Sequence, residues 1–339
     1  MAAEATTITV GGAEGRDIRI SSPSRVLWPE VGITKLDLAN YLVAVGDAFV
    51  EANGDRPVSL QRFPKDVTGE QFFSKNPPRG VPDFVRTVEV TFPSGRTHPQ
   101  LVIDEIAAAV WMVQMNTVVF HPWPSLSANT NNPDQIRVDL DPQEGTDFHD
   151  AIAVAHTLRE VLIEAKLTPF IKTSGNRGLH VFAPITPDHE FLDVRHAVIA
   201  AAREVERRMP DAATTSWWKE ERGKKIFLDY NQAARDRTTA GAYSPRPLAH
   251  APVSCPLGWD ELDGADPHNY TVLTVPERLQ KVGDPWAGMA SHAAPLTTLL
   301  EWWEKDLGNG LGELPFPPDY PKMPGEPPRV QPSKARSPG

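Results

Sequence analysis

The stretch Ile136-Arg-Val-Asp139-Leu-Asp141-Pro142 places two carboxylates in a mostly apolar segment that has the pattern of a β-strand. Side chains of a strand alternate between its two faces, so the three aliphatic residues are expected on one face and Asp139 and Asp141 on the other. Two carboxylates on the same face of a buried strand repel each other unless a cation lies between them. The stretch therefore predicts a sheet with its core on one face and a site for hard metal ions on the other.

Two further motifs extend this pattern. Asp229 ends a second apolar strand, Lys225-Ile-Phe-Leu-Asp229. Between the two strands, Lys172-Thr-Ser-Gly-Asn-Arg-Gly-Leu-His180 predicts a strand, a tight turn with two glycines, and a second strand. Glycine lets a backbone approach a ligand closely, and serine, arginine and histidine supply donors suited to a polyphosphate. Together the motifs predict metal-assisted chemistry on a phosphate-containing substrate.

The order of these motifs resembles the archaeo-eukaryotic primase superfamily and, within it, the polymerase domain of bacterial DNA ligase D. Further similarities are Arg25-Val-Leu-Trp-Pro29, Gln71-Phe-Phe-Ser-Lys75, His121-Pro-Trp123 and Tyr243-Ser-Pro-Arg246. The resemblance covers roughly residues 17 to 290. It implies an α/β (α+β) protein, in which a primase-type core with an RRM-like antiparallel sheet flanked by helices lies beside an N-terminal α/β portion.

Composition limits the class of protein. The chain has 339 residues, 40% of them hydrophobic and 23% charged, which fits a globular protein with a sizeable core. Cys255 is the only cysteine, which excludes an internal disulfide and a cysteine-rich zinc site. No apolar run is long enough for a membrane span, and the N-terminus lacks the pattern of a signal peptide, so the bacterial cytoplasm and its nucleoid are the expected location. The net charge of −10 predicts modest, salt-sensitive affinity for DNA rather than tight coating of duplex.

The chain is expected to divide into three parts. Residues 1–16 are predicted to be flexible, with room for a short strand at 6–10, residues 17–300 to form the catalytic domain, and residues 301–339 to form a proline-rich tail. Nine of the 25 residues from 315 to 339 are proline, a composition typical of an extended or disordered segment. No Lys-x-Asp-Gly motif is present, so we expect a stand-alone polymerase without a ligase or nuclease domain.

Periodicity and turn residues predict the elements of the catalytic part. Strands are expected at 58–62, 70–74, 86–92, 101–103, 136–140, 169–173, 179–184 and 225–229. Helices are expected at 34–54, 104–116, 147–165 and 193–209.

The resemblance assigns the three carboxylates to catalysis. Two-metal phosphoryl transfer needs carboxylates that bridge two cations about 3.5–4 Å apart. We therefore expect Asp139, Asp141 and Asp229 to be the catalytic and metal-binding residues, with two Mn²⁺ or Mg²⁺ ions as cofactors and no zinc. By itself, Asp139-Leu-Asp141-Pro142 would indicate an ordinary strand end before a turn. Asp229 and the glycine-rich turn, in this order, favour a metal site instead.

The resemblance also implies a nucleotide-binding set. The predicted residues are His121, Ser174, Arg177, His180, Arg237 and Arg246. Taken alone, Asn176-Arg-Gly178 is an ordinary turn sequence and a single histidine is usually a core residue. The family often has Ala-Pro-Tyr-Ser where this chain has Ala242-Tyr-Ser, a departure that affects the loop geometry and so the expected Arg246 contact.

A third group of residues is predicted to contact DNA. Arg25 and Lys35 are candidates for a 5′-phosphate pocket, because Lys35 lies in the first turn of a predicted helix, where the helix dipole favours an anion. Adjacent aromatics in a strand face opposite sides, so one of Phe72 and Phe73 is expected in the core and the other on a template base. The residues predicted to contact template or primer are Arg62, Phe72, Phe73, Lys75, Arg222 and Lys224.

The resulting hypothesis is template-directed nucleotidyl transfer at short gaps with 5′-phosphorylated DNA ends. The resemblance implies a preference for rNTPs over dNTPs, a role in repair such as non-homologous end joining, and Ku and a separate DNA ligase as partners. A second enzymatic hypothesis is a de novo primase, which would use the same residues. A non-enzymatic alternative is a catalytically idle module that binds DNA ends. A metal-dependent nuclease would leave Ser174, His180 and Arg246 without a role.

Overall fold

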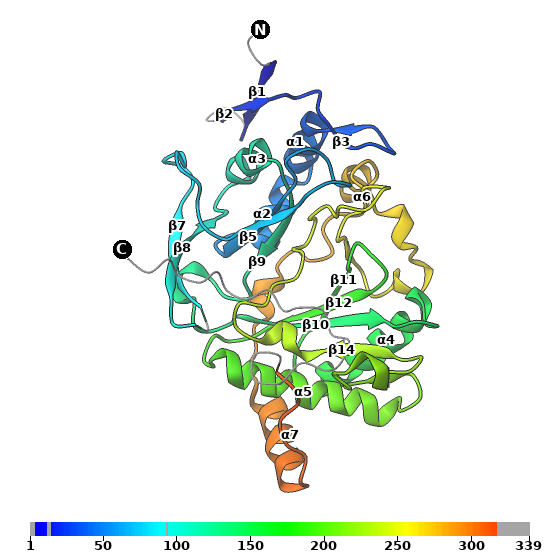
Figure 1. Cartoon of the computed structure of the whole chain (residues 1–339). Helices are drawn as coiled ribbons and strands as arrows, with labels where there is room; N and C mark the ends of the chain where they lie inside the picture. The colour runs from blue at the N-terminus through cyan, green and yellow to red at the C-terminus, as the bar shows by residue number, and fades with distance from the viewer. Residues whose placement is uncertain (1–3, 12–14, 93, 317–339) are drawn as a thin grey trace.

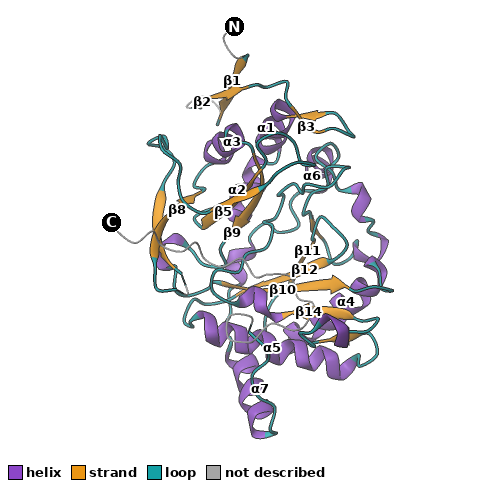
Figure 2. Cartoon of the chain, in the orientation of Figure 1, coloured by secondary structure: helices purple, strands orange, loops and turns teal. Residues whose placement is uncertain are grey.

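The strand that carries Asp139 and Asp141 runs through the middle of the larger of two main sheets (Figures 1 and 2). The computed structural model describes residues 4–11, 15–92 and 94–316. The strands are β1 (Ala5–Val10), β2 (Arg16–Ser21), β3 (Val26–Trp28), β4 (Ile33–Thr34), β5 (Pro57–Arg62), β6 (Phe72–Ser74), β7 (Thr87–Thr91), β8 (Thr97–Val102), β9 (Thr117–Pro122), β10 (Gln135–Pro142), β11 (Phe170–Thr173), β12 (Leu179–Pro184), β13 (Ala213–Thr214), β14 (Ile226–Asp229) and β15 (Pro256–Leu257). The helices are α1 (Lys35–Ala44), α2 (Gly46–Asn53), α3 (Ile106–Gln114), α4 (Phe148–Glu164), α5 (Phe191–Arg208), α6 (Val275–Val282) and α7 (Thr297–Gly308).

The larger sheet has six strands in the order β13-β14-β10-β12-β11-β15. All neighbours are antiparallel except β13 and β14. Along β10 the aliphatic side chains are buried while Asp139 and Asp141 are partly exposed, as the alternation in the sequence predicts. Helices α4 and α5 pack against each other and against β10, and they cover the apolar face of the sheet (Figure 1).

Local sequence explains where the covering helix α4 begins. Asp147 accepts hydrogen bonds from the backbone N–H groups of His149 and Asp150, and the Asp150 carboxylate accepts one from the Asp147 N–H. This capping box satisfies donors that the first turn would otherwise leave free. Thr34 and Asp37 form the same arrangement at the start of α1, as their spacing predicts.

The second main sheet belongs to the N-terminal portion. Its strands run β6-β5-β8-β7, and β9 pairs with β5. Helices α1, α2 and α3 pack on one another beside it (Figure 1). The antiparallel and mixed sheets flanked by helices confirm the predicted α/β class.

Three local predictions need correction. The helix expected at 34–54 is two helices that meet at Val45, where Gly46 lies so close to α3 that a Cβ would be 3.2 Å from the Ile106 side chain. Strand β9 was not predicted, although its run Val118-Val-Phe120 is the β-branched and aromatic signal of a strand. Neither Phe72 nor Phe73 is in the core: they are 43% and 55% exposed, because β6 is a three-residue strand paired only with β5.

The predicted domain boundaries remain predictions, but the structure places them within regular elements. Residues 5–10 form β1, which pairs with β2 across the expected boundary at residue 16. The boundary expected at residue 300 falls inside α7. Most of the predicted tail, residues 317–339, lies outside the described residues. Among the helices of the described chain, none combines the length and the hydropathy of a transmembrane segment.

Candidate active site

Strand register brings three of the predicted residues, Asp229, Asp139 and His180, into one row across the larger sheet. Asp139 of β10 lies opposite Asp229 of β14 on one side and opposite His180 of β12 on the other. His180 in turn lies opposite Lys172 of β11. Directly opposed residues share a face and have Cβ atoms about 4.5–5.5 Å apart. Four strands therefore present one continuous line of ionisable side chains, with Asp141 two residues further along β10.

The carboxylates at one end of this row oppose one another's ionisation. Burial, followed by the charges of Asp229 and Asp141, raises the pKa of Asp139 to about 8. Burial also raises the pKa of Asp229, although hydrogen bonds from Gln232 and the Asn231 N–H favour its charged form. A site that disfavours its own negative charge to this degree is suited to a positively charged ligand.

Each carboxylate is hydrogen-bonded to its own neighbours. Asp229 accepts from the Asn231 N–H at 2.9 Å and from Gln232 Nε2 at 2.8 Å. Gln143 Nε2 donates to Asp141 at 3.2 Å, and Asp139 Oδ1 lies 3.4 Å from His180 Nε2. Within the described ranges, no three His, Cys, Asp or Glu side chains are arranged so that they could hold a metal ion.

Lys172 completes the other end of the row and was missed by the sequence analysis. It is fully buried, and its Nζ lies 2.6 Å from His180 Nδ1 and 2.9 Å from the Ala240 carbonyl oxygen. Burial, and then the charge of Arg246, lowers its pKa well below the usual value. When His180 accepts a hydrogen bond from Lys172 at Nδ1, its own proton is on Nε2, which faces Asp139. A single lysine inside the otherwise uncharged strand Phe170–Thr173 is the signal that could have revealed it.

A pocket of about 210 Å³ adjoins this row. Of the predicted residues, those that line it are His121, Asp139, Asp141, Ser174, Arg177, His180 and Arg246. Strands β9, β10 and β12, the turn before β12 and the loop of Arg246 contribute these residues, so segments distant in sequence meet at the pocket. Arg237 is exposed and is not among the lining residues, and Asp229 lies next to the pocket through its pairing with Asp139.

Three buried polar atoms around this pocket have no hydrogen-bond partner within the part of the chain that the structure describes. They are His121 Nδ1, Thr239 Oγ1 and Arg246 Nε. Burial, followed by the charge of Arg246, lowers the pKa of His121 to about 3, so the imidazole is neutral. Buried polar groups without partners are costly, so their concentration at one pocket indicates a polar ligand that supplies the missing bonds.

The glycine-rich turn fits tightly against the catalytic strand. Ser174 Oγ accepts hydrogen bonds from the N–H groups of Asn176 and Gly178, both at 3.2 Å. A Cβ on Gly178 would be 2.2 Å from the Leu140 carbonyl oxygen. Gly175 has a φ of +70°, in the left-handed region that favours glycine. The turn thus needs both glycines to bring Ser174 beside β10.

The residues predicted to bind a 5′-phosphate lie in a second, separate cluster. Lys35 Nζ donates to the Gln114 carbonyl at 2.6 Å, Arg25 to the Pro64 carbonyl at 2.8 Å, and Arg62 to the Met115 carbonyl at 2.8 Å. Burial, and then the charges of Arg25 and Arg62, lowers the pKa of Lys35 to about 8. No carboxylate of the described residues forms an ion pair with any of these three cations. Three cations without a counter-charge form a suitable site for an anion.

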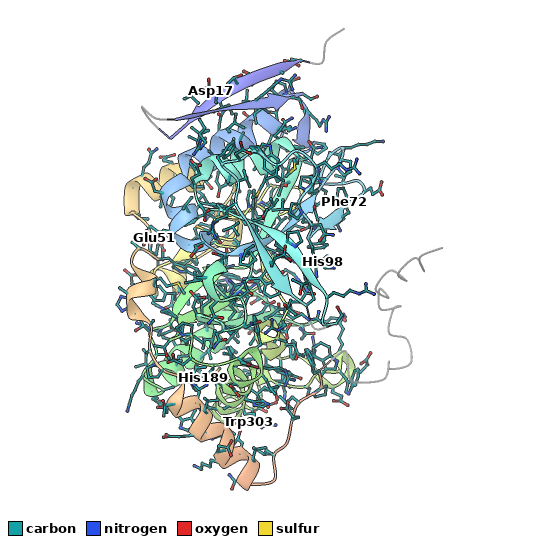
Figure 3. All side chains as sticks on the ribbon, turned by 90° about the vertical axis from the view of Figure 1, so that its left-hand side faces the viewer. Asp17, Glu51, Phe72, His98, His189 and Trp303 are labelled. Carbon is teal, nitrogen blue, oxygen red and sulfur yellow. The ribbon has the colours of Figure 1, made fainter. Side chains whose placement is uncertain are left out.

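The remaining predicted DNA contacts are placed differently. Phe72 and Phe73 are both exposed, with the Arg62 guanidinium 5.1 Å from the Phe72 ring and the Phe73 ring 5.4 Å from that of His121 (Figure 3 shows Phe72 at the margin of the molecule). Lys75 forms an ion pair with Asp236 at 2.7 Å.

Of the two residues in the turn before β14 that are predicted to contact DNA, Lys224 is exposed and Arg222 is half-buried. Arg222 lies over the Phe227 ring at 3.5 Å and donates to the Ser216 and Trp217 carbonyls, so it fastens its own loop. Arg222 also donates to Gln143 Oε1 at 3.3 Å, and Gln143 holds Asp141. Arg222 is thus connected to Asp141 only through Gln143.

Comparison with known proteins gives concordant similarities. Residues 34–286 match the family model described as "LigD, primase-polymerase domain". The chain is 32% identical over 298 residues to the multifunctional non-homologous end joining protein LigD of Pseudomonas aeruginosa, covering 86% of this chain and 35% of that protein. It is 29% identical over 292 residues to the bifunctional LigD of Bacillus subtilis, covering 85% and 47%. The chain thus spans less than half the length of these curated relatives.

A solved structure is similar over nearly its whole length. The polymerase domain from Mycobacterium tuberculosis ligase D, in complex with DNA, matches with a TM-score of 0.74 and 28% sequence identity. The match covers 81% of this chain and 99% of that one. The similarity therefore concerns a complete polymerase domain.

Proposed function

The chain belongs to the family of LigD primase-polymerase domains, which are metal-dependent nucleotidyltransferases, and from this premise we propose that it fills short gaps at 5′-phosphorylated DNA ends. The observation that carries the proposal is the row Asp229–Asp139–His180–Lys172 beside a pocket that contains Arg246 and three unpartnered polar atoms. In this arrangement a carboxylate cluster suited to cations lies next to a polar pocket suited to a triphosphate.

The carboxylate end fits divalent metal ions by the chemistry of its donors. Asp139, Asp141 and Asp229 offer only oxygen ligands, which Mg²⁺ and Mn²⁺ prefer. We propose that these three residues hold two such ions after their side chains turn away from Gln143, Gln232 and His180. Ions held by these residues would lower the pKa of a primer 3′-hydroxyl and neutralise charge on the triphosphate.

The other end of the row is proposed to bind and orient the nucleotide. Arg246 offers a buried guanidinium with an unpartnered Nε, and His180 offers its Nε2–H because Lys172 occupies Nδ1. Ser174 presents its hydroxyl at the turn, and His121 remains neutral and free to hydrogen-bond. Charge-assisted donors held in fixed positions align the α-phosphate for attack at little entropic cost. Arg177 and the more remote Arg237 are proposed to add positive charge.

The proposed substrates and partners follow from the relatives. The similar Mycobacterium tuberculosis domain was solved with DNA, and the curated relatives are named for non-homologous end joining. We propose gapped or broken duplex as the DNA substrate, rNTPs as the favoured nucleotides, and Ku and a separate DNA ligase as partners. Phe72, Phe73, Lys75 and Lys224 are proposed to contact template or primer.

Primer extension tests this proposal directly. On a duplex with a short gap and Mn²⁺, we expect templated incorporation that is faster with rNTPs than with dNTPs. A downstream 5′-phosphate is expected to increase the rate several-fold over a 5′-hydroxyl. DNA binding without any extension would contradict the polymerase proposal and favour the idle end-binding module.

The phosphate response should depend on pH through Lys35. Its pKa of about 8 means that the ammonium is charged below about pH 8 and becomes neutral above it. We therefore expect the ratio of rates with and without the 5′-phosphate to fall as pH rises through about 8. Lys35→Gln should lower this ratio and remove its pH dependence in this range, whereas Lys281→Gln on exposed α6 should preserve both. A wild-type ratio that is constant across this range would contradict the assignment.

A further inference from the structure

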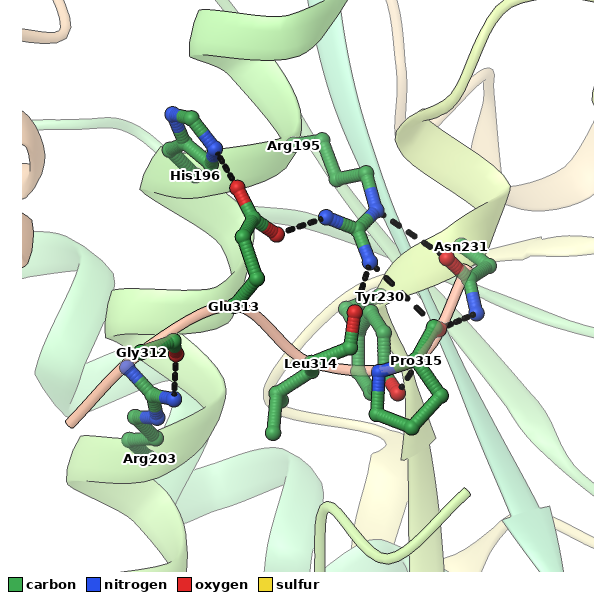
Figure 4. A network of polar contacts seen from close by, with 9 residues as sticks. All are labelled: Arg195, His196, Arg203, Tyr230, Asn231, Gly312, Glu313, Leu314 and Pro315. Carbon is green, nitrogen blue, oxygen red and sulfur yellow. Dashed lines mark hydrogen bonds and ion pairs between the residues drawn. The ribbon is translucent and has the colours of Figure 1, made fainter. Parts of the chain in front are cut away.

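The segment after α7 returns to the catalytic part of the molecule and lies against α5 (Figure 4). We call its residues Gly312–Phe316 the C-terminal strap. The Glu313 carboxylate accepts from Arg195 Nη1 at 2.6 Å, and the Leu314 carbonyl accepts from Arg195 Nη2 at 2.8 Å. Arg203 donates to the Gly312 carbonyl and His196 contacts the Glu313 carboxylate. The strap is thus fastened by polar contacts at several successive residues.

Arg195 is the centre of this network. The residue is 3% exposed, and its Nε donates to Asn231 Oδ1 at 3.0 Å while its Nη atoms bind the strap. The guanidinium lies 5.3 Å from the Tyr230 ring and 5.3 Å from the Phe316 ring. A buried guanidinium is costly unless its donors are paired, so the strap and Asn231 together make this buried charge tolerable.

Asn231 connects the strap to the catalytic carboxylate. Its Nδ2 donates to the Pro315 carbonyl at 3.1 Å, and its backbone N–H donates to Asp229 Oδ1 at 2.9 Å. Asp229 is the last residue of β14 and caps the short 3₁₀ turn Tyr230–Ala233. The Asn231 N–H of that turn holds the Asp229 carboxylate, and the Asn231 side chain donates to the Pro315 carbonyl of the strap (Figure 4).

We propose that Arg195 and the C-terminal strap are positioning elements for Asp229, which fix the turn after β14 so that this carboxylate can complete the divalent-cation site. The inference rests on the proposed function and adds to it Arg195 and the strap, whose residues lie 84 to 120 positions in sequence from their hydrogen-bond partners. The strap also lies beyond residues 34–286, which match the family model.

The nature of the contacts argues for positioning rather than simple packing. Arg195 touches both Asn231 and the strap, and it does so through three different nitrogens. A fork of this kind specifies direction as well as distance. Loss of a partner that orients a metal-binding carboxylate typically lowers metal affinity 10- to 100-fold.

The test is Mn²⁺ binding to the full chain without DNA or nucleotide, measured by the electron paramagnetic resonance signal of free Mn²⁺. Arg195→Gln is the main variant and Glu313→Gln, whose side chain is 47% exposed, is a milder one that does not leave a cavity in the core. Arg208→Gln is the matched control, since this arginine of the same helix pairs with Glu164 and Glu204. Asp229→Asn reports whether the site itself binds the metal.

We expect the Mn²⁺ dissociation constant to rise about 10-fold in Arg195→Gln and more than twofold in Glu313→Gln, with Arg208→Gln unchanged. A dissociation constant within twofold of wild type in folded Arg195→Gln would overturn the positioning role. If Arg195→Gln does not fold, Glu313→Gln decides by the same twofold limit. If Asp229→Asn binds Mn²⁺ as tightly as wild type, the metal site itself fails, whereas a failure confined to Arg195 and Glu313 leaves the proposed function intact.

Discussion

Asp139→Asn is expected to lower the rate of nucleotidyl transfer by about 10³-fold or more. Asp139 is central to the row, because it lies opposite both Asp229 and His180 and is flanked by Asp141 on its own strand. An amide at this position cannot supply the negative charge that the proposed divalent-cation site needs. Primer extension with the variant measures the effect, and Asp188→Asn, an exposed carboxylate away from the pocket, is the control.

The same substitution is expected to stabilise the protein when metal is absent. The folded-state pKa of Asp139 is about 8, above its ordinary value of 3.8, because burial and two neighbouring carboxylates disfavour the charged form. Such a group costs no folding free energy below about pH 4, and the cost grows as pH rises towards about 8. The full cost is on the order of a few kcal/mol.

Thermal unfolding in a chelator measures this second effect. We expect the Tm of Asp139→Asn to exceed that of the wild type above about pH 8 and the difference to shrink towards about pH 4. If the variant and the wild type have the same Tm at about pH 8 as well as at about pH 4, Asp139 is not held among like charges. The pair of outcomes, loss of activity with gain of stability, separates a strained functional carboxylate from an ordinary structural one.

Gly178→Ala is expected to damage both folding and catalysis. The new methyl would lie 2.2 Å from the Leu140 carbonyl oxygen and 3.1 Å from Pro142 Cδ, neither of which belongs to a flexible side chain. Strands β10 and β12 would have to separate just where Asp139 and His180 face each other. Overpacking of this kind costs about 1–3 kcal/mol or more, and the displacement would move Ser174 away from the pocket.

The free energy of unfolding and the rate of primer extension are the two measurements for this variant. Gly264→Ala is the matched control, because a Cβ at that position would have no atom within 4 Å and its backbone is not left-handed. Wild-type stability and activity in Gly178→Ala would mean that the turn does not approach β10 as closely as we describe.

The strands of the larger sheet were largely predictable because their signals are local. The alternation along β10 places Asp139 and Asp141 on one face whatever the rest of the chain does, and the capping residues Thr34 and Asp147 begin helices through contacts within three residues. The turn between β11 and β12 was likewise predictable, since Gly175 and Gly178 meet a backbone requirement that the sequence displays. These features depend on short-range geometry, which the order of residues fixes directly.

Other parts of the site could not be derived from local pattern. The exposure of both Phe72 and Phe73 depends on β6 having a neighbour on only one side. Arg222 was expected to contact DNA, yet the Phe227 ring and two carbonyls of its own loop hold it. The link from Glu313 through Arg195 to the turn after Asp229 has no counterpart in any motif.

The sequence by itself determined which ionisable residues interrupt the apolar strands and which face of β10 Asp139 and Asp141 occupy. Only the tertiary structure decided that Asp229, Asp139, His180 and Lys172 share one row, because strand order and register arise from packing between segments distant in the chain. The same holds for the cluster of Arg25, Lys35 and Arg62 and for the strap that reaches Asn231. Periodicity predicts which face of a helix or strand is apolar. Which other segment packs against that face depends on how the whole core is buried.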